Sequence, residues 1–403
     1  MRATPSPGRV GDVRRQNLAL ILTGLLSNGQ ATRAQLAAES GLTKASVSSL
    51  VADLIDAGLV QESSVTRDGE RGRPGTGIIL NPARGALGAE INVDYLAVGV
   101  LDFTGQLRFH ETLERHNRGS RPGEVFPLLV TMARRAADAA QAAGIELLGG
   151  GLTVPGLVDT ERDVLINAPN LGWAGVGLSA ELQELLPGSR FGVTLSNEAN
   201  SAALAELWFG HGAMFHGARF KDYLYLSGEV GVGGGLVIGS ELFAGPHGHA
   251  GEIGHMVVHP DGPRCTCGGH GCLEKFAGQH AIFLAAGIGG ESTVAQTAHL
   301  LRSLAEGNVR ATAAVEQAGH YLGVAVASAA RLTNVPAVVL GGHFAVLEPW
   351  LGPALRRSLA NYAPGLIPDG NIAFSRLREP AALMGAAGSS VRNVLGRSYE
   401  LIS

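Results

Sequence analysis

The sequence has few cysteines and no long apolar run. Cysteine accounts for only 3 of the 403 residues, and this odd number argues against a disulfide framework and for a reducing compartment. No stretch reaches the roughly 18 apolar residues that a membrane-spanning helix needs. Residues 18–26 follow Arg14 and Arg15 as in a twin-arginine signal, but this run is short and its leucines share one helical face. We therefore expect a cytoplasmic protein that does not contact a membrane.

Charge is also sparse, and it is unevenly distributed. Charged residues make up 16% of the chain, and the formal net charge is −4. Residues 1–80 contain nine Arg or Lys and seven Asp or Glu, which leaves 22 basic and 28 acidic residues in the remainder. A mildly basic head thus precedes an acidic body. This distribution permits nucleic-acid binding by the head, but it is weak evidence for it.

Glycine and apolar residues are plentiful by comparison. The 58 glycines are about twice the usual share and follow no collagen-like period, so they indicate many tight turns or ligand-lining loops. A hydrophobic fraction of 45% excludes a disordered chain. The length predicts about two or three domains.

Residues 1–82 show the pattern of a winged helix-turn-helix domain. A first helix is expected over residues 13–26, and Thr32 with Gln35 three positions later marks the start of a second. Thr43, after a short glycine turn, marks the start of a third helix. The apolar positions of that helix recur with helical spacing at Val47, Leu50, Val51, Leu54 and Ile55. Its opposite face is small and polar, as expected of a helix that reads the major groove.

Two short strands, at residues 59–63 and 77–80, enclose a hairpin rich in arginine and glycine. Such a hairpin beside three helices resembles a wing, which suits contacts with phosphate or with the minor groove. The candidate DNA-binding residues are Arg33, Lys44, Ser46, Ser48, Ser49, Arg71 and Arg73. The alternative interpretation is an ordinary three-helix domain with a solvated loop.

Residues 83–403 form a body in which strands and helices alternate. Strands are expected at residues 90–102, 150–153, 193–195, 223–226, 236–238 and 337–340, and helices before residue 143 and at residues 199–208 and 311–331. This alternation predicts an α/β fold with two lobes around a cleft. Helix 311–331 is rich in alanine and valine, which suits a subunit interface and core packing equally.

The most specific chemistry lies in residues 252–274. Cys265, Cys267 and Cys272 are all the cysteines of the chain, and His255 precedes them closely. Three thiolates and one imidazole are a complete tetrahedral ligand set for Zn²⁺, so the site would be structural. His270 competes with His255 as the nitrogen ligand, and unpaired loop cysteines are the remaining alternative.

Several further motifs accompany the cysteine cluster that ends in Glu274, at residues 154–159, 167–173, 197–200, 231–235 and 248–255. With these motifs the sequence resembles the ROK family of repressors and sugar kinases over nearly its whole length. The resemblance implies an actin-like, ribonuclease-H-like fold of two lobes with a boundary near residue 200. It also implies a C-terminal helix that returns to the first lobe, a winged helix in the repressor branch, and His255 as the nitrogen ligand.

The resemblance further implies a hexose in the cleft between the lobes. The positions that match the family's sugar contacts are Asn170, Asn197, Glu198, Glu252, His255 and Glu274. Carboxylates and carboxamides suit this role because each can pair with adjacent sugar hydroxyls. His255 would bind the metal through one nitrogen and face the sugar with the other.

Three departures from the family's kinases argue against catalysis. The first phosphate turn of those kinases contains a glycine and a hydroxyl, whereas this chain has Asn92 and Asp94. Glu229 and Val230 replace the opening Gly-Thr of the second phosphate loop. Glu198 stands where the kinases have an aspartate base, so it is a vestigial base position and no catalytic residue is predicted.

We therefore expect a sugar-responsive repressor of carbohydrate-metabolism genes that binds operator DNA and a sugar effector and carries a structural Zn²⁺. The alternative is an ATP-dependent sugar kinase with an appended DNA-binding domain. A repressor controlled by a protein partner is a third possibility, which the intact set of sugar contacts disfavours. Because operators pair two half-sites, a homodimer or homotetramer is expected.

Overall fold

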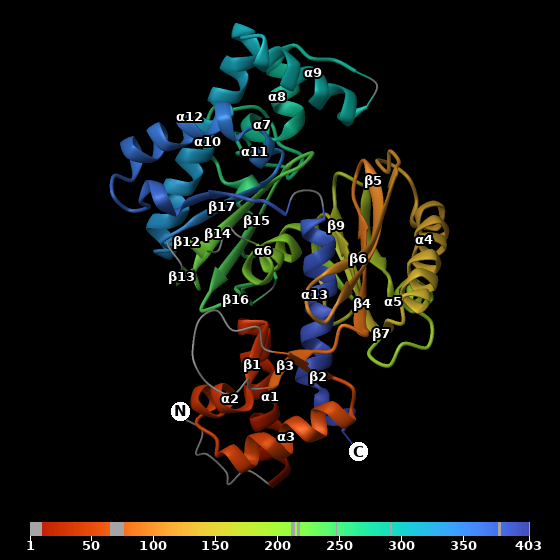
Figure 1. Ribbon diagram of the computed structural model, residues 1–403. Helices are drawn as coiled ribbons and strands as arrows, with labels where there is room; N and C mark the ends of the chain where they lie inside the picture. The colour runs from red at the N-terminus through yellow and green to blue at the C-terminus, as the bar shows by residue number, and fades with distance from the viewer. Residues whose placement is uncertain are drawn as a thin grey trace.

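The computed structural model describes residues 10–64, 76–210, 214–215, 218–246, 248–290, 292–377 and 380–402. A small head lies below two α/β lobes, of which the first is on the right of Figure 1 and the second on the upper left. No helix in these ranges is both long and apolar enough to cross a membrane.

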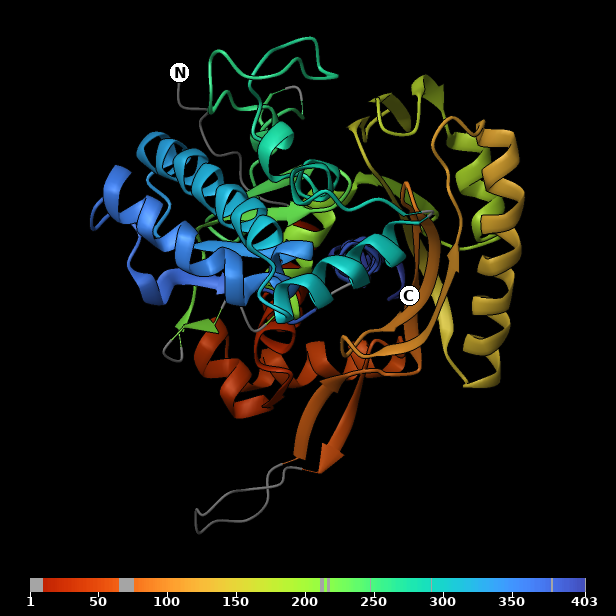
Figure 2. The ribbon, with the colours of Figure 1, turned by 90° about the horizontal axis from the view of Figure 1, so that it is seen from above.

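The head is a three-helix unit with a small antiparallel sheet. Its elements are α1 (Val10–Asn28), β1 (Gln30–Thr32), α2 (Arg33–Ser40), α3 (Lys44–Asp56), β2 (Val60–Ser64) and β3 (Thr76–Leu80), with the sheet order β1-β3-β2. Thr32 and Gln35 form the expected capping box, and the Thr43 side chain accepts from the Ser46 amide at the start of α3. The predicted helix-turn-helix and the two wing strands are confirmed. Figure 2 shows β2 and β3, in orange, projecting beyond the body.

The first lobe is built on a mixed five-stranded sheet of order β11-β7-β4-β5-β6. Its strands are β4 (Arg84–Ile91), β5 (Tyr95–Asp102), β6 (Leu107–Glu114), β7 (Glu146–Val154) and β11 (Val193–Asn197). Helix α4 (Pro122–Ala142) packs on one face, and the C-terminal helix α13 (Ala381–Gly396) packs on β4, β5 and β7. A second small sheet, of β8 (Leu157–Asp159), β9 (Val164–Ala168) and β10 (Trp173–Gly177), and the short α5 (Ser179–Leu185) complete the lobe.

The expectation of one strand over residues 90–102 was wrong. The chain turns at residues 92–94, so that β4 and β5 are separate antiparallel strands. The Asn92 amide donates to the Tyr95 carbonyl, and the Asn92 side chain accepts from the Asp94 amide. An asparagine can bond its own backbone two residues on and so make a tight turn without glycine.

The second lobe is built on a sheet of order β16-β15-β14-β17-β18. Its strands are β14 (Tyr223–Gly228), β15 (Val232–Ile238), β16 (Glu241–Leu242), β17 (Val338–Gly342) and β18 (Ile372–Phe374). Helix α6 (Glu198–Trp208) packs on β14 and β15, while α10 (Val309–Thr333) and α12 (Glu348–Tyr362) pack together in the core that includes Leu226 and Leu340. Core packing therefore accounts for the buried face of α10.

The remaining described helices of the second lobe are the 3-10 helices η1 (Ile253–His255) and η2 (Asp369–Asn371) and the helices α7 (Glu274–Ala277), α8 (Gln279–Ala286), α9 (Thr293–Ala305) and α11 (His343–Val346). Helices α8 and α9 lie at the upper end of this lobe in Figure 1.

Helix α13 connects all three parts of the molecule (Figure 1). Gly88, Gly99 and Gly151 lie where this helix meets the sheet, and a Cβ on Gly151 would come within 2.5 Å of the Ala386 carbonyl oxygen. Gly385 crosses α6 at Ser201 so closely that any Cβ would collide with the Ser201 main chain. The apolar core beneath α13 continues into the buried leucines of α1. The head is thus packed against the body and is not merely tethered to it.

Candidate functional site

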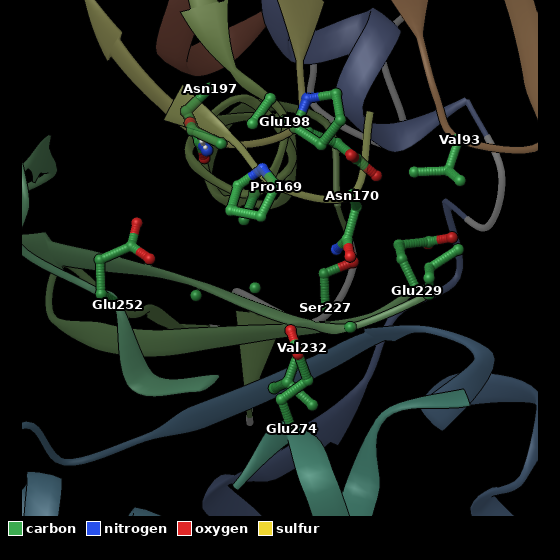
Figure 3. Close-up of a pocket in the computed structure, with 18 of the residues that line it drawn as sticks. Val93, Pro169, Asn170, Asn197, Glu198, Ser227, Glu229, Val232, Glu252 and Glu274 are labelled. Carbon is green, nitrogen blue, oxygen red and sulfur yellow. Dashed lines mark hydrogen bonds between the residues drawn. The ribbon is translucent and has the colours of Figure 1, made fainter. Parts of the chain in front are cut away.

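A cavity of about 110 Å³, the interlobe cavity, opens between the two lobes. The first lobe and α6 line it with Asn92, Val93, Pro155, Gly156, Ala168, Pro169, Asn170, Asn197, Glu198 and Ala199. The second lobe lines it with residues 227 and 229–234 and with Glu252, His255, Thr266 and Glu274. The structure therefore brings all the predicted sugar contacts to one cavity. Figure 3 shows five of them, Asn170, Asn197, Glu198, Glu252 and Glu274, around the cavity.

Glu198 is the most deeply buried of these carboxyl groups. It begins α6, and its Oε1 accepts a 3.1 Å hydrogen bond from Asn92 Nδ2. Burial raises the pKa of Glu198 to about 7, although the bond from Asn92 acts in the opposite direction. A carboxyl group poised near neutral pH can accept a proton or a hydrogen bond from a hydroxyl.

Asn197 lines the cavity, but its amide group is already engaged. Its Oδ1 caps α6 by accepting from the Asn200 amide at 2.9 Å, and its Nδ2 donates to the Gly156 carbonyl at 2.7 Å. The side chain therefore fixes the start of α6 to the turn at Gly156. Asn197 has less bonding capacity left for a ligand than its sequence position suggests.

Glu252, His255 and Glu274 form the wall of the cavity that belongs to the second lobe. Burial, followed by the charge of Glu274, raises the pKa of Glu252, and His255 and His249 oppose that shift. His255 Nε2 lies 4.0 Å from Glu252 Oε2. Gly231 leaves room for Glu274, because a Cβ at this glycine would collide with the Glu274 carboxylate.

The lining of the interlobe cavity is strongly acidic. Its carboxyl groups are Glu198, Glu229, Glu252 and Glu274, and none of the described residues that line it is Lys or Arg. Several acceptors with no fixed cation favour a neutral ligand that is rich in hydroxyl donors. An anion in the same space would be repelled by Coulomb interactions in a partly desolvated cleft.

The predicted metal ligands also come together. His255, Cys265, Cys267 and Cys272 place their ligand atoms within 4.8 Å of one another. Cys265 Sγ lies 3.7 Å from His255 Nδ1, and Cys267 Sγ lies 3.6 Å from Cys272 Sγ. Zn–S bonds of about 2.3 Å in a tetrahedron give ligand separations of roughly 3.8 Å, so the spacing fits a tetrahedral metal. His270, the competing nitrogen, is exposed and does not belong to this group.

The glycine run at residues 231–235 is largely a strand, and its expected role as a loop was wrong. Residues 232–235 lie in β15, where a Cβ on Gly233 or Gly235 would crowd α6. These glycines therefore allow helix and sheet to approach closely. Glu229 lies against the turn at the end of β17, because a Cβ on Gly342 would come within 2.6 Å of Glu229 Oε1.

The candidate DNA contacts divide into three groups. Lys44, Ser48 and Ser49 are exposed on α3, at the end of the head farthest from the lobes in Figure 1. Ser46 and Arg33 have partners within the head: Ser46 bonds to Thr43, and Arg33 pairs with Glu62 at 2.8 Å. Arg71 and Arg73 lie outside the described residues.

Two residues of the cavity were missed as contacts by reasoning from the sequence. Asn92, seen only as a departure from kinases, is the hydrogen-bond partner of Glu198. Thr266 reaches the cavity from between two cysteine ligands. Its position inside the metal-binding loop is the signal that could have identified it.

Comparison with known proteins matches both parts of the chain. The model of the ROK family matches residues 86–389, and that of the MarR family matches residues 19–72. A putative xylose repressor of Caldicellulosiruptor sp. is 28% identical, over 95% of this chain and 97% of its own length. A glucokinase of Halalkalibacterium halodurans is 32% identical, over 56% of this chain and 70% of its own length.

A solved structure described as a ROK family transcriptional regulator, homolog of the Escherichia coli MLC protein, has a similar arrangement. It superposes with a TM-score of 0.73 at 25% identity, covering 97% of this chain and 99% of the other. This agreement extends over the head as well as the body.

The raised pKa of Glu198 predicts a pH-dependent stability. A glutamate in the unfolded chain has a pKa of about 4.3, so the folded state holds the proton of Glu198 more tightly than the unfolded state does. Protonation of Glu198 therefore contributes its full stabilisation of the folded state below about pH 4.3. This contribution is lost as the pH rises through about 7. Glu198→Gln cannot ionise but still accepts from Asn92. Between about pH 5 and pH 8, the wild type should therefore lose about 1 to 3 kcal/mol more than the variant.

Thermal unfolding of both proteins at the two pH values measures this difference. Glu184→Gln, on the exposed side of α5, is the matched control and should keep the wild-type profile. Equal pH profiles for wild type and Glu198→Gln would show that the buried carboxyl does not titrate in this range.

Proposed function

Because the chain belongs to the ROK family, we propose that it is a sugar-responsive transcriptional repressor of carbohydrate-metabolism genes. The observation that carries the proposal is the acidic interlobe cavity, whose described lining contains no Lys or Arg. The body that holds this cavity packs directly against a winged helix. The xylose repressor and the MLC-like regulator align with head and body together, which supports the same pairing of functions here.

The ligand of the interlobe cavity is a neutral sugar. Glu198, Glu252 and Glu274 accept hydrogen bonds from ring hydroxyls, and Asn170 serves as donor and acceptor. Asn197 holds the first turn of α6 in place. His255 turns Nδ1 to the cysteines and Nε2 toward Glu252, so its second nitrogen is available to the sugar.

Two carboxylates make the cleft unfavourable for a nucleotide. Glu229 lies against Gly342, in the turn at the end of β17. Asp94 lies at the tip of the first-lobe turn and accepts a 2.7 Å hydrogen bond from Thr293 on α9. Both would repel a triphosphate, and we infer that the chain is not a kinase.

The coupling between sugar and DNA passes through elements that touch both lobes and the head. A sugar held between Glu198 and Glu274 joins the start of α6 to the second lobe, and the bond of Asp94 to Thr293 crosses the same gap. Helix α6 crosses α13, which packs on α1. In this proposal the protein acts in the cytoplasm as a homodimer or homotetramer. A change in lobe closure then moves the DNA-binding heads of the oligomer relative to each other. The sugar and operator affinities are therefore coupled reciprocally.

Calorimetric titration distinguishes this regulator from a kinase. Sugars should bind the metal-loaded protein with affinities that Mg²⁺-ATP does not change, and no sugar phosphate should form. Xylose and glucose are the first sugars to test. Turnover to sugar phosphate would overturn the proposal in favour of the kinase, and binding of no sugar in a broad panel would favour a repressor controlled by a protein partner.

Lys44 provides the test of DNA binding. The probe is a duplex selected by the wild-type protein from a random pool. If the lysine contacts a base, Lys44→Ala should weaken DNA binding by about 1 to 3 kcal/mol, or roughly 5-fold to 150-fold. If the lysine contacts a phosphate, the variant should instead reduce the slope of log affinity against log salt concentration by about 1. Lys221→Ala, on the exposed surface of the body, is the control. An unchanged affinity and salt dependence for Lys44→Ala would refute the assignment of α3.

His255, Cys265, Cys267 and Cys272 would hold a structural Zn²⁺. With four protein ligands, the site is closed to water, and the metal supplies folding energy rather than reactivity. Its role for the ligand is indirect. It fixes His255 and the loop that carries Thr266 and Glu274 beside the sugar.

Metal analysis tests this site. The wild type should contain about one zinc per chain, and Cys267→Ser should lose most of it with a lower thermal midpoint and weaker sugar binding. His270→Ala is the matched control and should retain the metal, because His270 lies outside the cluster. One zinc per chain in Cys267→Ser, or its loss in His270→Ala, would contradict the ligand set.

A further inference from the structure

A second and larger cavity adjoins the interlobe cavity on the side of the metal-binding loop. We call it the outer cavity, and its volume is about 540 Å³. Asn170, Val230, Thr266 and Glu274 line both cavities, so the two cavities adjoin at these residues. A third cavity beside Asp94 shares only Val230 with the interlobe cavity. Of these two neighbours, the outer cavity shares more of its lining with the interlobe cavity, so it is the better candidate to receive a ligand that extends beyond the first sugar.

We propose that the outer cavity binds a further sugar residue, so that the effector is a disaccharide or a longer glycoside. This inference rests on the proposed function, because it takes the first sugar to occupy the interlobe cavity. It goes further by naming the class of effector, which the motifs of the sequence leave open.

The chemistry of the outer cavity differs from that of the interlobe cavity in a way that suits a glycoside. Apolar surface comes from Phe276 and from Ala281, Leu284 and Ala285 on α8, and Leu284 is 70% exposed. The C–H face of a sugar ring packs against such surface, as apolar linings do in most ligand pockets. The Phe276 ring is held by Tyr321, whose ring centroid is 4.2 Å away.

Polar groups at the rim supply mainly hydrogen-bond donors. Arg118, Lys275, His280 and Gln317 line the outer cavity, whereas carboxylate acceptors dominate the interlobe cavity. A bound glycoside presents hydroxyl, ring and glycosidic oxygens that accept from such donors. The two cavities together thus offer acceptors to one sugar ring and donors to the next.

A phosphoryl group is the alternative occupant, and the arrangement of charge disfavours it. Lys275 Nζ lies 3.9 Å from Glu274 Oε1, so a carboxylate already accompanies this ammonium group. Arg118 is exposed on the first lobe, on the opposite side of the cleft from α8. On α8, His280 is the one described side chain of this lining that could donate to a phosphate, because Ala281, Leu284 and Ala285 are apolar.

The test compares monosaccharides with matched disaccharides on the full-length protein. Calorimetry is run with xylose and xylobiose, with glucose, cellobiose and maltose, with N-acetylglucosamine and its β-1,4 dimer, and with glucose 6-phosphate. At least one disaccharide should bind about 10-fold or more tightly than its monosaccharide, a gain typical of added polar and packing contacts.

Two variants on helices of the second lobe locate the gain. Ala285→Trp fills the outer cavity from the exposed side of α8 and should remove the disaccharide advantage while leaving monosaccharide affinity within about 2-fold. Ala298→Trp, on an exposed position of α9 that lines no described cavity, is the matched control. Retained monosaccharide binding shows that the Ala285→Trp protein is folded.

Each contrary outcome identifies what has failed. Monosaccharides that bind as tightly as every disaccharide, or a disaccharide advantage that survives in Ala285→Trp, would overturn the second sugar position and leave the proposed function intact. Glucose 6-phosphate that exceeds all disaccharides, with a gain that Arg118→Ala abolishes, would overturn it in favour of an anion site. Binding of no sugar of either length would overturn the proposed function and this inference together.

Discussion

The close packing of α13 is the constraint on which the rest of the architecture depends. The helix lies against β4, β5 and β7 and crosses α6 at Gly385, where any side chain would collide with Ser201. Such contact is possible only because glycines remove Cβ atoms from both surfaces. It places the first turn of α6, and with it Glu198, at a fixed position relative to the sheet of the first lobe. The same helix continues to the head, so the position of the ligand site and the attachment of the winged helix have one structural origin.

Charge then determines what the cleft can hold. Four carboxyl groups line the interlobe cavity with no Lys or Arg among the described residues that line it, and concentrating them there is unfavourable because each loses hydration. The raised pKa values of Glu198 and Glu252 are the sign of that cost. A hydroxyl-rich neutral ligand compensates for it by donating hydrogen bonds. Arg118, Lys275, His280 and Gln317 line the outer cavity, so the chemistry changes from acceptors to donors along the path that we propose for a glycoside.

The parts that could be predicted from the sequence are those with a local cause. Thr32 and Thr43 each determine a helix start through a bond to a residue three positions later, and the spacing of the cysteines predicts a cluster of possible metal ligands, which the structure brings together. The turn at Asn92 was missed because an asparagine bonding to its own backbone resembles a strand residue in an apolar run. The glycines of β15 were misread because their purpose is contact with α6, which lies elsewhere in the chain. Family resemblance predicted the sugar contacts, and these residues line one cavity, but only the fold shows that Asn92 bonds to Glu198 and that the second cavity adjoins the first.

The continuous core between head and body provides a physical route for the proposed regulation of DNA binding by a ligand. A 100-fold change in operator affinity requires a coupling free energy of about 2.7 kcal/mol. A head on a flexible linker would not sense lobe closure, because its contacts would be the same in both states. Here Leu18, Leu22 and Leu25 of α1 belong to the core that also contains Leu383 and Val391 of α13. Full exposure of one such side chain costs about 1.5 to 3 kcal/mol. A shift of α13 that exposes apolar surface equal to one or two of these leucines therefore supplies the required coupling, and α13 also packs on α6, whose first turn carries Glu198 in the proposed sugar site.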